Sequence, residues 1–159
     1  MRGIDRQAVT PPFYVMAWTL LLTANITLGY IVAPVLFNGL SSEQAGQLMG
    51  VFLTGLYGFD LVWLSLMLLV LALQRRFYWA REAILVSAIL WVALNLWGVS
   101  PLMSALKSLD VATSRIYGLT FAQWHGISQM LFLLMLLCCI VWGLWFARSH
   151  DAVSVKPKH

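Results

Sequence analysis

The chain has 159 residues, of which 61% are hydrophobic and only 10% are charged, and its mean hydropathy is +0.83. A soluble domain carries about 25% charged residues, so this composition excludes an ordinary soluble protein and indicates a lipid bilayer as the surrounding medium. The formal charge of +4 comes from few ionisable groups, which cluster outside the apolar stretches. We therefore expect one membrane domain and no nucleic-acid partner.

Four apolar stretches are long enough to cross a bilayer, which takes about 20 helical residues. They cover residues 13–37, 48–73, 78–99 and 121–146. The first stretch is too long for the apolar core of a signal peptide and no convincing cleavage site follows it, so we expect it to stay as a helix. Because the connections are short, consecutive helices are expected to pack antiparallel. The sequence thus predicts an all-α, up-down four-helix membrane bundle over residues 13–146.

The distribution of Lys and Arg predicts the orientation of the bundle, because these residues accumulate on the cytoplasmic side. Lys107 and Arg115 lie in the third connection, and the first connection has no basic residue. Eight basic residues lie on the other side: Arg2, Arg6, Arg75, Arg76, Arg81, Arg148, Lys156 and Lys158. We expect a multi-pass protein of a bacterial inner membrane, with a cytoplasmic N-terminus at residues 1–12 and a basic cytoplasmic tail at residues 147–159.

The third connection carries a helical signal of its own. Ser100 is a candidate N-cap followed by Pro101, and Gly118 closes the stretch. Apolar residues recur at helical spacing between them, at Leu102, Leu106, Leu109 and Ile116. This pattern predicts a short amphipathic helix on the outer membrane surface, between the third and fourth spans. The alternative is that the stretch simply extends the third span.

Small residues form a stripe at the start of the second span. Gly46, Gly50, Thr54 and Gly58 recur at every fourth position. In lipid, small residues allow helix backbones to approach closely. We interpret the stripe as a helix-packing surface inside the bundle, with Gly29 of the first span as the facing residue. A homodimer seam is the alternative.

One acid lies deep in the second span. A bare carboxylate at the position of Asp60 costs about 3 kcal/mol on insertion scales. Counted from the outer ends of their spans, Asn25 and Asp60 lie equally deep, roughly 18 Å at 1.5 Å per residue. We therefore expect Asn25 to pair with Asp60, with Thr23, Thr27 and Tyr57 as further donors. The group is either a proton or cation relay, a ligand-anchoring acid, or a polar clasp that fixes helix register.

A histidine lies about one turn into the fourth span. Ser128 and Gln129 are three and four residues after His125 and are expected to share its face. His125 can titrate, form hydrogen bonds or bind a metal, but no second histidine lies within the spans. It is the candidate metal ligand, while no cofactor, haem and copper included, is predicted. Together with Asn95, which lies at intermediate depth, these residues suggest a polar path from the outer face inward: Asn25, Asp60, Asn95, His125, Ser128 and Gln129.

Three stretches, in this order, resemble a known family: "LGYIVAPVLFNGLSSEQAGQLMGVF", "NLWGVSPLMSALK" and "FAQWHGISQMLFLL". Together they are similar to the bacterial membrane domain of unknown function 4149, which is grouped with the eukaryotic transmembrane protein 205. The resemblance covers most of residues 18–135 and implies a four-helix membrane domain with no established activity. The family often has an Asn a few residues after the Ser of the fourth span, where this chain has Gln129. The matching positions are Ala33, Pro34, Phe37, Ala45, Gly46, Asn95, Pro101, His125, Gly126 and Ser128.

No catalytic constellation is apparent in the sequence. We therefore expect a non-enzymatic inner-membrane protein, either an accessory subunit or a small transport-related component. The alternative is a cofactor- or metal-dependent membrane redox or transport protein that uses His125 and Asp60. The small-residue stripe also allows a homodimer or a larger membrane complex.

Overall fold

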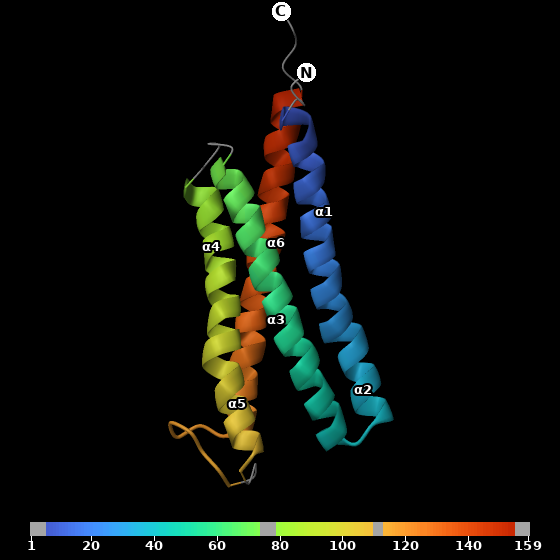
Figure 1. Cartoon of the computed structure of the whole chain (residues 1–159), viewed down its shortest axis with the longest axis vertical. Helices are drawn as coiled ribbons and strands as arrows, with labels where there is room; N and C mark the ends of the chain where they lie inside the picture. Colours follow the sequence, from blue (N-terminus) through green and yellow to red (C-terminus); the bar gives the residue numbers. More distant parts are fainter. Residues whose placement is uncertain (1–5, 74–78, 110–112, 155–159) are drawn as a thin grey trace, which may run out of the picture.

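Long apolar helices run side by side in the computed structural model, which describes residues 6–73, 79–109 and 113–154 (Figure 1). Four segments are long and apolar enough to cross a membrane: Pro12–Gly39, Ser42–Leu73, Trp79–Lys107 and Phe121–Arg148. They overlap the four predicted spans, and the second begins six residues earlier than expected. The all-α, four-helix membrane fold is confirmed.

Consecutive membrane spans are antiparallel neighbours. Along the chain the elements are α1 (Arg6–Ile26), η1 (Thr27–Val32), α2 (Ala33–Gly39), α3 (Ser42–Leu73), α4 (Trp79–Ala93), η2 (Leu94–Val99), α5 (Ser100–Lys107) and α6 (Phe121–Ser154). Helices α1 and α4 each pack against both α3 and α6, which closes the bundle. The start of α1 and the end of α6 lie together, and we call this the terminal end (Figure 1). The opposite end, which holds α2 and α5, is the far end.

Two of the spans contain a π-helical segment, and each segment precedes a proline. Segment η1 ends two residues before Pro34, and η2 ends two residues before Pro101. Proline lacks a backbone N–H, and its ring crowds the carbonyl group four residues earlier. A wider π-helical turn accommodates this misfit, so both helices continue through their prolines. The first span is therefore continuous from α1 to α2, and the third from α4 to α5.

This continuity corrects the sequence interpretation of the third connection. The helix expected there is present as α5, but it extends the third span and is not a separate surface helix. Ser100 has helical backbone angles and makes no side-chain cap, because the chain is already helical before it. The helix ends at Lys107, and Tyr117 and Gly118 have positive φ angles of 52° and 78° in a later turn.

Apolar side chains occupy both the inside and the outside of the bundle. Between the helices, Leu21, Leu64 and Trp142 are each 1% exposed. The outer faces expose other large apolar residues, such as Val51 and Val62. Such surfaces fit a bundle that is surrounded by lipid. Several basic residues that carry the predicted orientation lie outside the described residues: Arg2, Arg75, Arg76, Lys156 and Lys158.

Candidate functional site

Buried polar side chains form three groups along the bundle axis. The terminal layer consists of Arg81, Glu82 and Trp142, near the terminal end. The middle pair is Asn25 and Asp60. The far layer consists of Tyr57, Asn95 and Ser128.

The middle pair joins α1 to α3. Nδ2 of Asn25 donates hydrogen bonds to Oδ1 of Asp60 over 2.8 Å and to the backbone carbonyl of Leu21 over 2.9 Å. Both side chains of the pair are 0% exposed. The contact expected from their equal depth is therefore present.

One oxygen atom of each side chain in the middle pair is left over. Three buried side-chain atoms of the described residues have no hydrogen-bond partner: Oδ1 of Asn25, Oδ2 of Asp60 and, apart from this pair, the hydroxyl of Tyr14. Most buried polar atoms in native proteins are paired, because an unpaired one costs about 1–3 kcal/mol. The hydrogen bonding of the pair is thus incomplete in the chain by itself.

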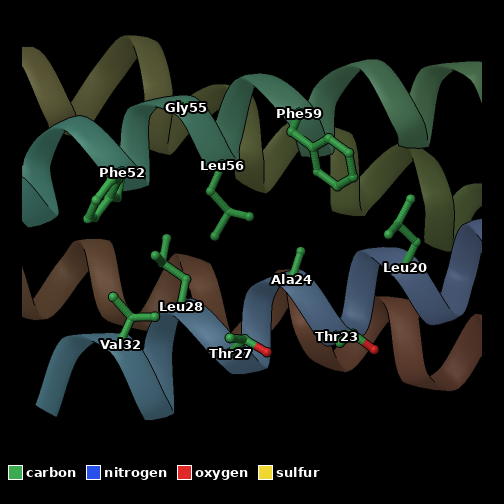
Figure 2. Close-up of a pocket in the computed structure, with 10 residues that line it drawn as sticks. All are labelled: Leu20, Thr23, Ala24, Thr27, Leu28, Val32, Phe52, Gly55, Leu56 and Phe59. Carbon is green, nitrogen blue, oxygen red and sulfur yellow. The ribbon is translucent and has the colours of Figure 1, made fainter. Parts of the chain in front are cut away.

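An open groove lies between α1–η1 and α3, beside the middle pair (Figure 2). Its volume is about 550 Å³ and its walls are almost entirely apolar. Thr23 and Thr27, which were expected to bond to Asp60, line this groove instead. Ala24 and Phe59, the chain neighbours of the pair, also line it. The groove therefore adjoins the middle pair, whose own side chains are fully buried.

The far layer joins η2 to α3 and α6. Nδ2 of Asn95 donates to the hydroxyl of Tyr57 over 3.1 Å and to the backbone carbonyl of Ser128 over 2.9 Å. In return, the Ser128 hydroxyl donates to Oδ1 of Asn95 over 2.7 Å. Tyr57, expected as a donor to Asp60, thus bonds to Asn95. Tyr57 lies one helical turn from Asp60 on α3, so the far layer and the middle pair are adjacent.

His125 and Gln129 lie outside these layers. Both are exposed on α6, with their Nε2 atoms 3.0 Å apart, and the His125 ring stacks on Phe121 at a centroid distance of 6.2 Å. Ser128 is buried, so the expectation that it shares a face with His125 is wrong. Positions three residues apart on a helix differ by roughly 60° in direction, which here separates an inward side chain from an outward one. The structure therefore brings together Asn95 and Ser128, and Asn25 and Asp60, but not His125 or Gln129.

Sequence reasoning missed the terminal layer. Nε and Nη2 of Arg81 donate to Oε1 of Glu82 over 3.0 and 2.7 Å, and Glu82 is 0% exposed. Nε1 of Trp142 lies 3.5 Å from Oε2 of Glu82, and the Arg81 guanidinium lies 5.8 Å from the ring centre of Phe146. Arg81 had been interpreted only as an orienting charge. Its adjacent acid, at the start of an apolar helix, was the available signal for an inward-facing ion pair.

The small-residue stripe does not pack against a helix within the described chain. Nζ of Lys107 donates to the backbone carbonyl of Gly46 over 2.9 Å, and a Cβ atom at Gly50 would lie 3.7 Å from the same Nζ. A Cβ atom at Gly58 would meet open space. Gly29 faces Phe132 of α6, so the prediction that it faces the stripe is wrong. The stripe makes room for a lysine that connects α5 to α3.

Thr54, the remaining member of the stripe, donates its hydroxyl hydrogen bond to the carbonyl of Gly50 on its own helix. The homodimer alternative stays a prediction. So does His125 as a metal ligand: across residues 6–73, 79–109 and 113–154, no three His, Cys, Asp or Glu side chains come together.

Comparison with known proteins identifies the family of the chain. Neither the curated proteins nor the solved structures include a match to it. The family model described as Domain of unknown function (DUF4149) matches residues 16–112. This range holds the middle pair, both π-helical segments and Asn95 of the far layer. The chain is a four-helix membrane protein that belongs to the DUF4149 family.

Proposed function

We propose that the protein is a non-enzymatic, transport-related membrane component in which the middle pair and the far layer carry a small cation. The observation that supports this proposal is the middle pair, where a buried carboxylate and a buried amide each keep one oxygen atom without a partner. Ionisable residues inside membrane spans are costly, and they mark ion pathways and proton relays.

The order of the buried groups supports a path that is polar on the far side of the middle pair and apolar on its terminal side. From the far end, Ser128, Asn95 and Tyr57 lead through continuous hydrogen bonds to the helical turn of Asp60. One helical turn closer to the terminal end, Leu21 lies next to Asn25 on α1 and Leu64 lies next to Asp60 on α3. Both leucines are apolar and only 1% exposed. This apolar step separates the middle pair from the terminal layer, as a transport path that must not leak requires.

The basic residues of the sequence supply a direction. Among the described residues, Arg6, Arg81 and Arg148 lie near helix ends toward the terminal end. Lys107 ends α5 and Arg115 lies between α5 and α6, both toward the far end. The sequence prediction of eight basic residues against two points the same way. By the positive-inside rule the terminal end then faces the cytoplasm of a bacterial inner membrane, and the far layer lies on the outer side of the middle pair. The same bundle fits an accessory role in a larger complex, in which the cation path serves a partner subunit.

The positions of His125 and Asp60 support the redox alternative less well than the cation path. That alternative needs His125 and Asp60 to act together. His125 is on the exposed face of α6, bonded to Gln129, whereas Asp60 is buried between α1 and α3.

Ion flux into liposomes tests the proposal. The purified protein is reconstituted, a proton or sodium gradient is imposed, and uptake is followed with an enclosed pH-sensitive dye or with radioactive sodium. We expect uptake of one of the two ions above that of empty liposomes, a loss of this uptake with Asp60→Ala, and no loss with Glu43→Gln. Glu43 is the matched control because it is an exposed acid on the same helix. Uptake no faster than in empty liposomes for both ions would contradict the proposal.

A further inference from the structure

We propose that the middle pair binds a single proton on Oδ2 of Asp60 and thereby closes into a ring of two hydrogen bonds between an acid and an amide. This inference rests on the proposed function, because it names the ion and the atom that holds it. A carboxylic acid and a carboxamide pair through two bonds: the amide N–H donates to the acid carbonyl, and the acid O–H donates to the amide carbonyl.

Half of this ring is already present. Asn25 Nδ2 donates to Asp60 Oδ1 over 2.8 Å, and the atoms left without partners are the two that the second bond of the ring requires. An ionised carboxylate only accepts hydrogen bonds, as does the amide oxygen, so neither of the two unpaired atoms can donate to the other. A proton on Oδ2 turns that atom into a donor to Asn25 Oδ1. One proton therefore satisfies both unpaired atoms.

The orientation of the amide is fixed independently of Asp60. The second hydrogen of Asn25 Nδ2 is donated to the backbone carbonyl of Leu21, one turn earlier on the same helix, over 2.9 Å. The amide cannot flip without losing both of its donated bonds. Its oxygen is thus held in the acceptor position of the ring.

The number of available oxygen atoms favours a proton over a metal ion. Hard metal cations take six or more oxygen ligands. The middle pair offers only two oxygen atoms without partners among the described residues. Leu21 and Leu64, on the adjoining turns, add only apolar side chains. A proton needs one donor site and one acceptor, and the pair provides both.

The groups that face Asp60 do not supply a positive charge. Tyr57 on α3 and Cys139 on α6 are the titratable groups that interact with its carboxylate, and both are neutral when protonated. The facing residue on α1 is Asn25, and the third span contributes the uncharged Asn95, which bonds to Tyr57. Within the described chain, no cation compensates a buried carboxylate at this position. The proton is the charge compensation that the geometry provides.

Proton release has a structural consequence. It leaves one hydrogen bond in place of two between α1 and α3. The groove shown in Figure 2 lies between the same helices and is lined by Ala24 and Phe59, the chain neighbours of the pair. The same proton therefore controls how firmly α1 is held to α3.

Infrared spectroscopy of the full chain in lipid nanodiscs at neutral pH tests this inference. A protonated carboxylic acid gives a carbonyl band that is separate from the amide bands and shifts in heavy water. We expect such a band in the wild type, its loss in Asp60→Asn, and its retention in Glu43→Gln. The amide introduced by Asp60→Asn reproduces both bonds of the ring, so this variant should stay folded. Absence of an Asp60-dependent band would overturn the inference.

A second variant tests the ring itself. Asn25→Ala removes the amide, so the Asp60 carbonyl band should move to higher frequency or disappear, whereas Tyr57→Phe should leave it in place. If Asn25→Ala is not recovered in a folded form, Asn25→Ser provides the same comparison. A band at an unchanged position in the Asn25 variant, or one that sodium abolishes in the wild type, would overturn the ring.

The experiments distinguish a failure of the transport proposal from a failure of the hydrogen-bonded ring. An Asp60-dependent band without ion flux in liposomes rejects the transport role and leaves the ring in place. Flux without the band rejects the ring and leaves the transport role in place.

Discussion

Asn95 and Ser128 exchange two hydrogen bonds between η2 and α6, one from the Asn95 amide to the Ser128 carbonyl over 2.9 Å and one from the Ser128 hydroxyl to Oδ1 of Asn95 over 2.7 Å. Because Asn95 also donates to the Tyr57 hydroxyl, one buried amide connects three helices. The far layer is therefore a structural junction as well as part of the proposed path.

Removing this junction should destabilise the bundle. Ser128→Ala deletes one bond and should lower the free energy of unfolding by about 0.6–1.7 kcal/mol, which are the average and the largest values measured by double-mutant cycles for hydrogen bonds between membrane helices. Asn95→Leu should cost more, since it also leaves Tyr57 without its partner. Detergent-induced unfolding of the purified protein measures both changes. Ser87→Ala is the matched control, because Ser87 bonds only to its own helix at an exposed site. Equal stability of Ser128→Ala and Ser87→Ala would contradict the role of the junction.

Close packing between Trp18 and Gly143 should also contribute to the stability of the bundle. The Trp18 indole donates to the carbonyl of Cys139 over 2.8 Å, and a Cβ atom at Gly143 would overlap the indole ring. We expect Gly143→Ala to cost about 1–3 kcal/mol through overpacking. Thermal unfolding in detergent provides the measurement.

The control for this prediction is Gly126→Ala on the same helix, where a Cβ atom meets open space. It should be neutral, or stabilising by about 0.5–1 kcal/mol, because alanine favours a helix over glycine. In a Trp18→Ala background, Gly143→Ala should lose most of its cost. A cost that persists there would show that the indole is not the cause.

The ion pair of the terminal layer should depend on both of its partners. Glu82→Leu removes the carboxylate that Arg81 contacts at 2.7 Å and should destabilise the protein by about 3–5 kcal/mol. The double variant Arg81→Leu with Glu82→Leu should be more stable than Glu82→Leu alone, because it leaves no buried charge behind. Unfolding titrations of the three variants and the wild type form the required cycle. A double variant less stable than Glu82→Leu would contradict the prediction.

Large side chains should affect stability differently at Gly50 and at Gly58 of the small-residue stripe. Gly50→Ile pushes a side chain toward Nζ of Lys107 and should weaken the contact between α5 and α3. Gly58→Ile meets open space within the chain and should change the stability of the folded chain by less than about 0.5 kcal/mol. Thermal unfolding distinguishes the two variants. Energy transfer between labelled copies in liposomes tests the homodimer alternative, since a seam along the stripe would lose affinity with Gly58→Ile.

Positions along the helices were predictable from the sequence. The rise of 1.5 Å per residue placed Asn25 and Asp60 at one depth, and the structure joins them. Rotation about the helix axis was not predictable, because almost every face of these helices is apolar. For this reason the sequence did not show that His125 faces outward while Ser128 faces inward, or that Lys107 occupies the glycine stripe.

Pro101 misled the prediction of a separate surface helix for a different reason. In a soluble protein, a proline after a serine, as at Pro101, usually indicates the start of a helix, because the exposed backbone groups there can bond to water. In a bilayer the backbone groups need partners within the chain, so a helix that continues through a π-helical turn is favoured over one that stops. The ion pair of Arg81 and Glu82 was overlooked because charges at a span end are usually solvated.

The two π-helical segments give the bundle an uneven stiffness. Helices α1 and α4 run in the same direction, and η1 and η2 are followed by only seven and eight residues of helix, so both lie toward the far end. The terminal end, by contrast, is fastened by a buried ion pair and by stacked aromatic rings. Of the two helices beyond the π-helical segments, α5 is held to α3 by Lys107, and η2 before it is held to α6 by the far layer. Any movement between the helices should therefore be largest at α2 and smallest at the terminal end.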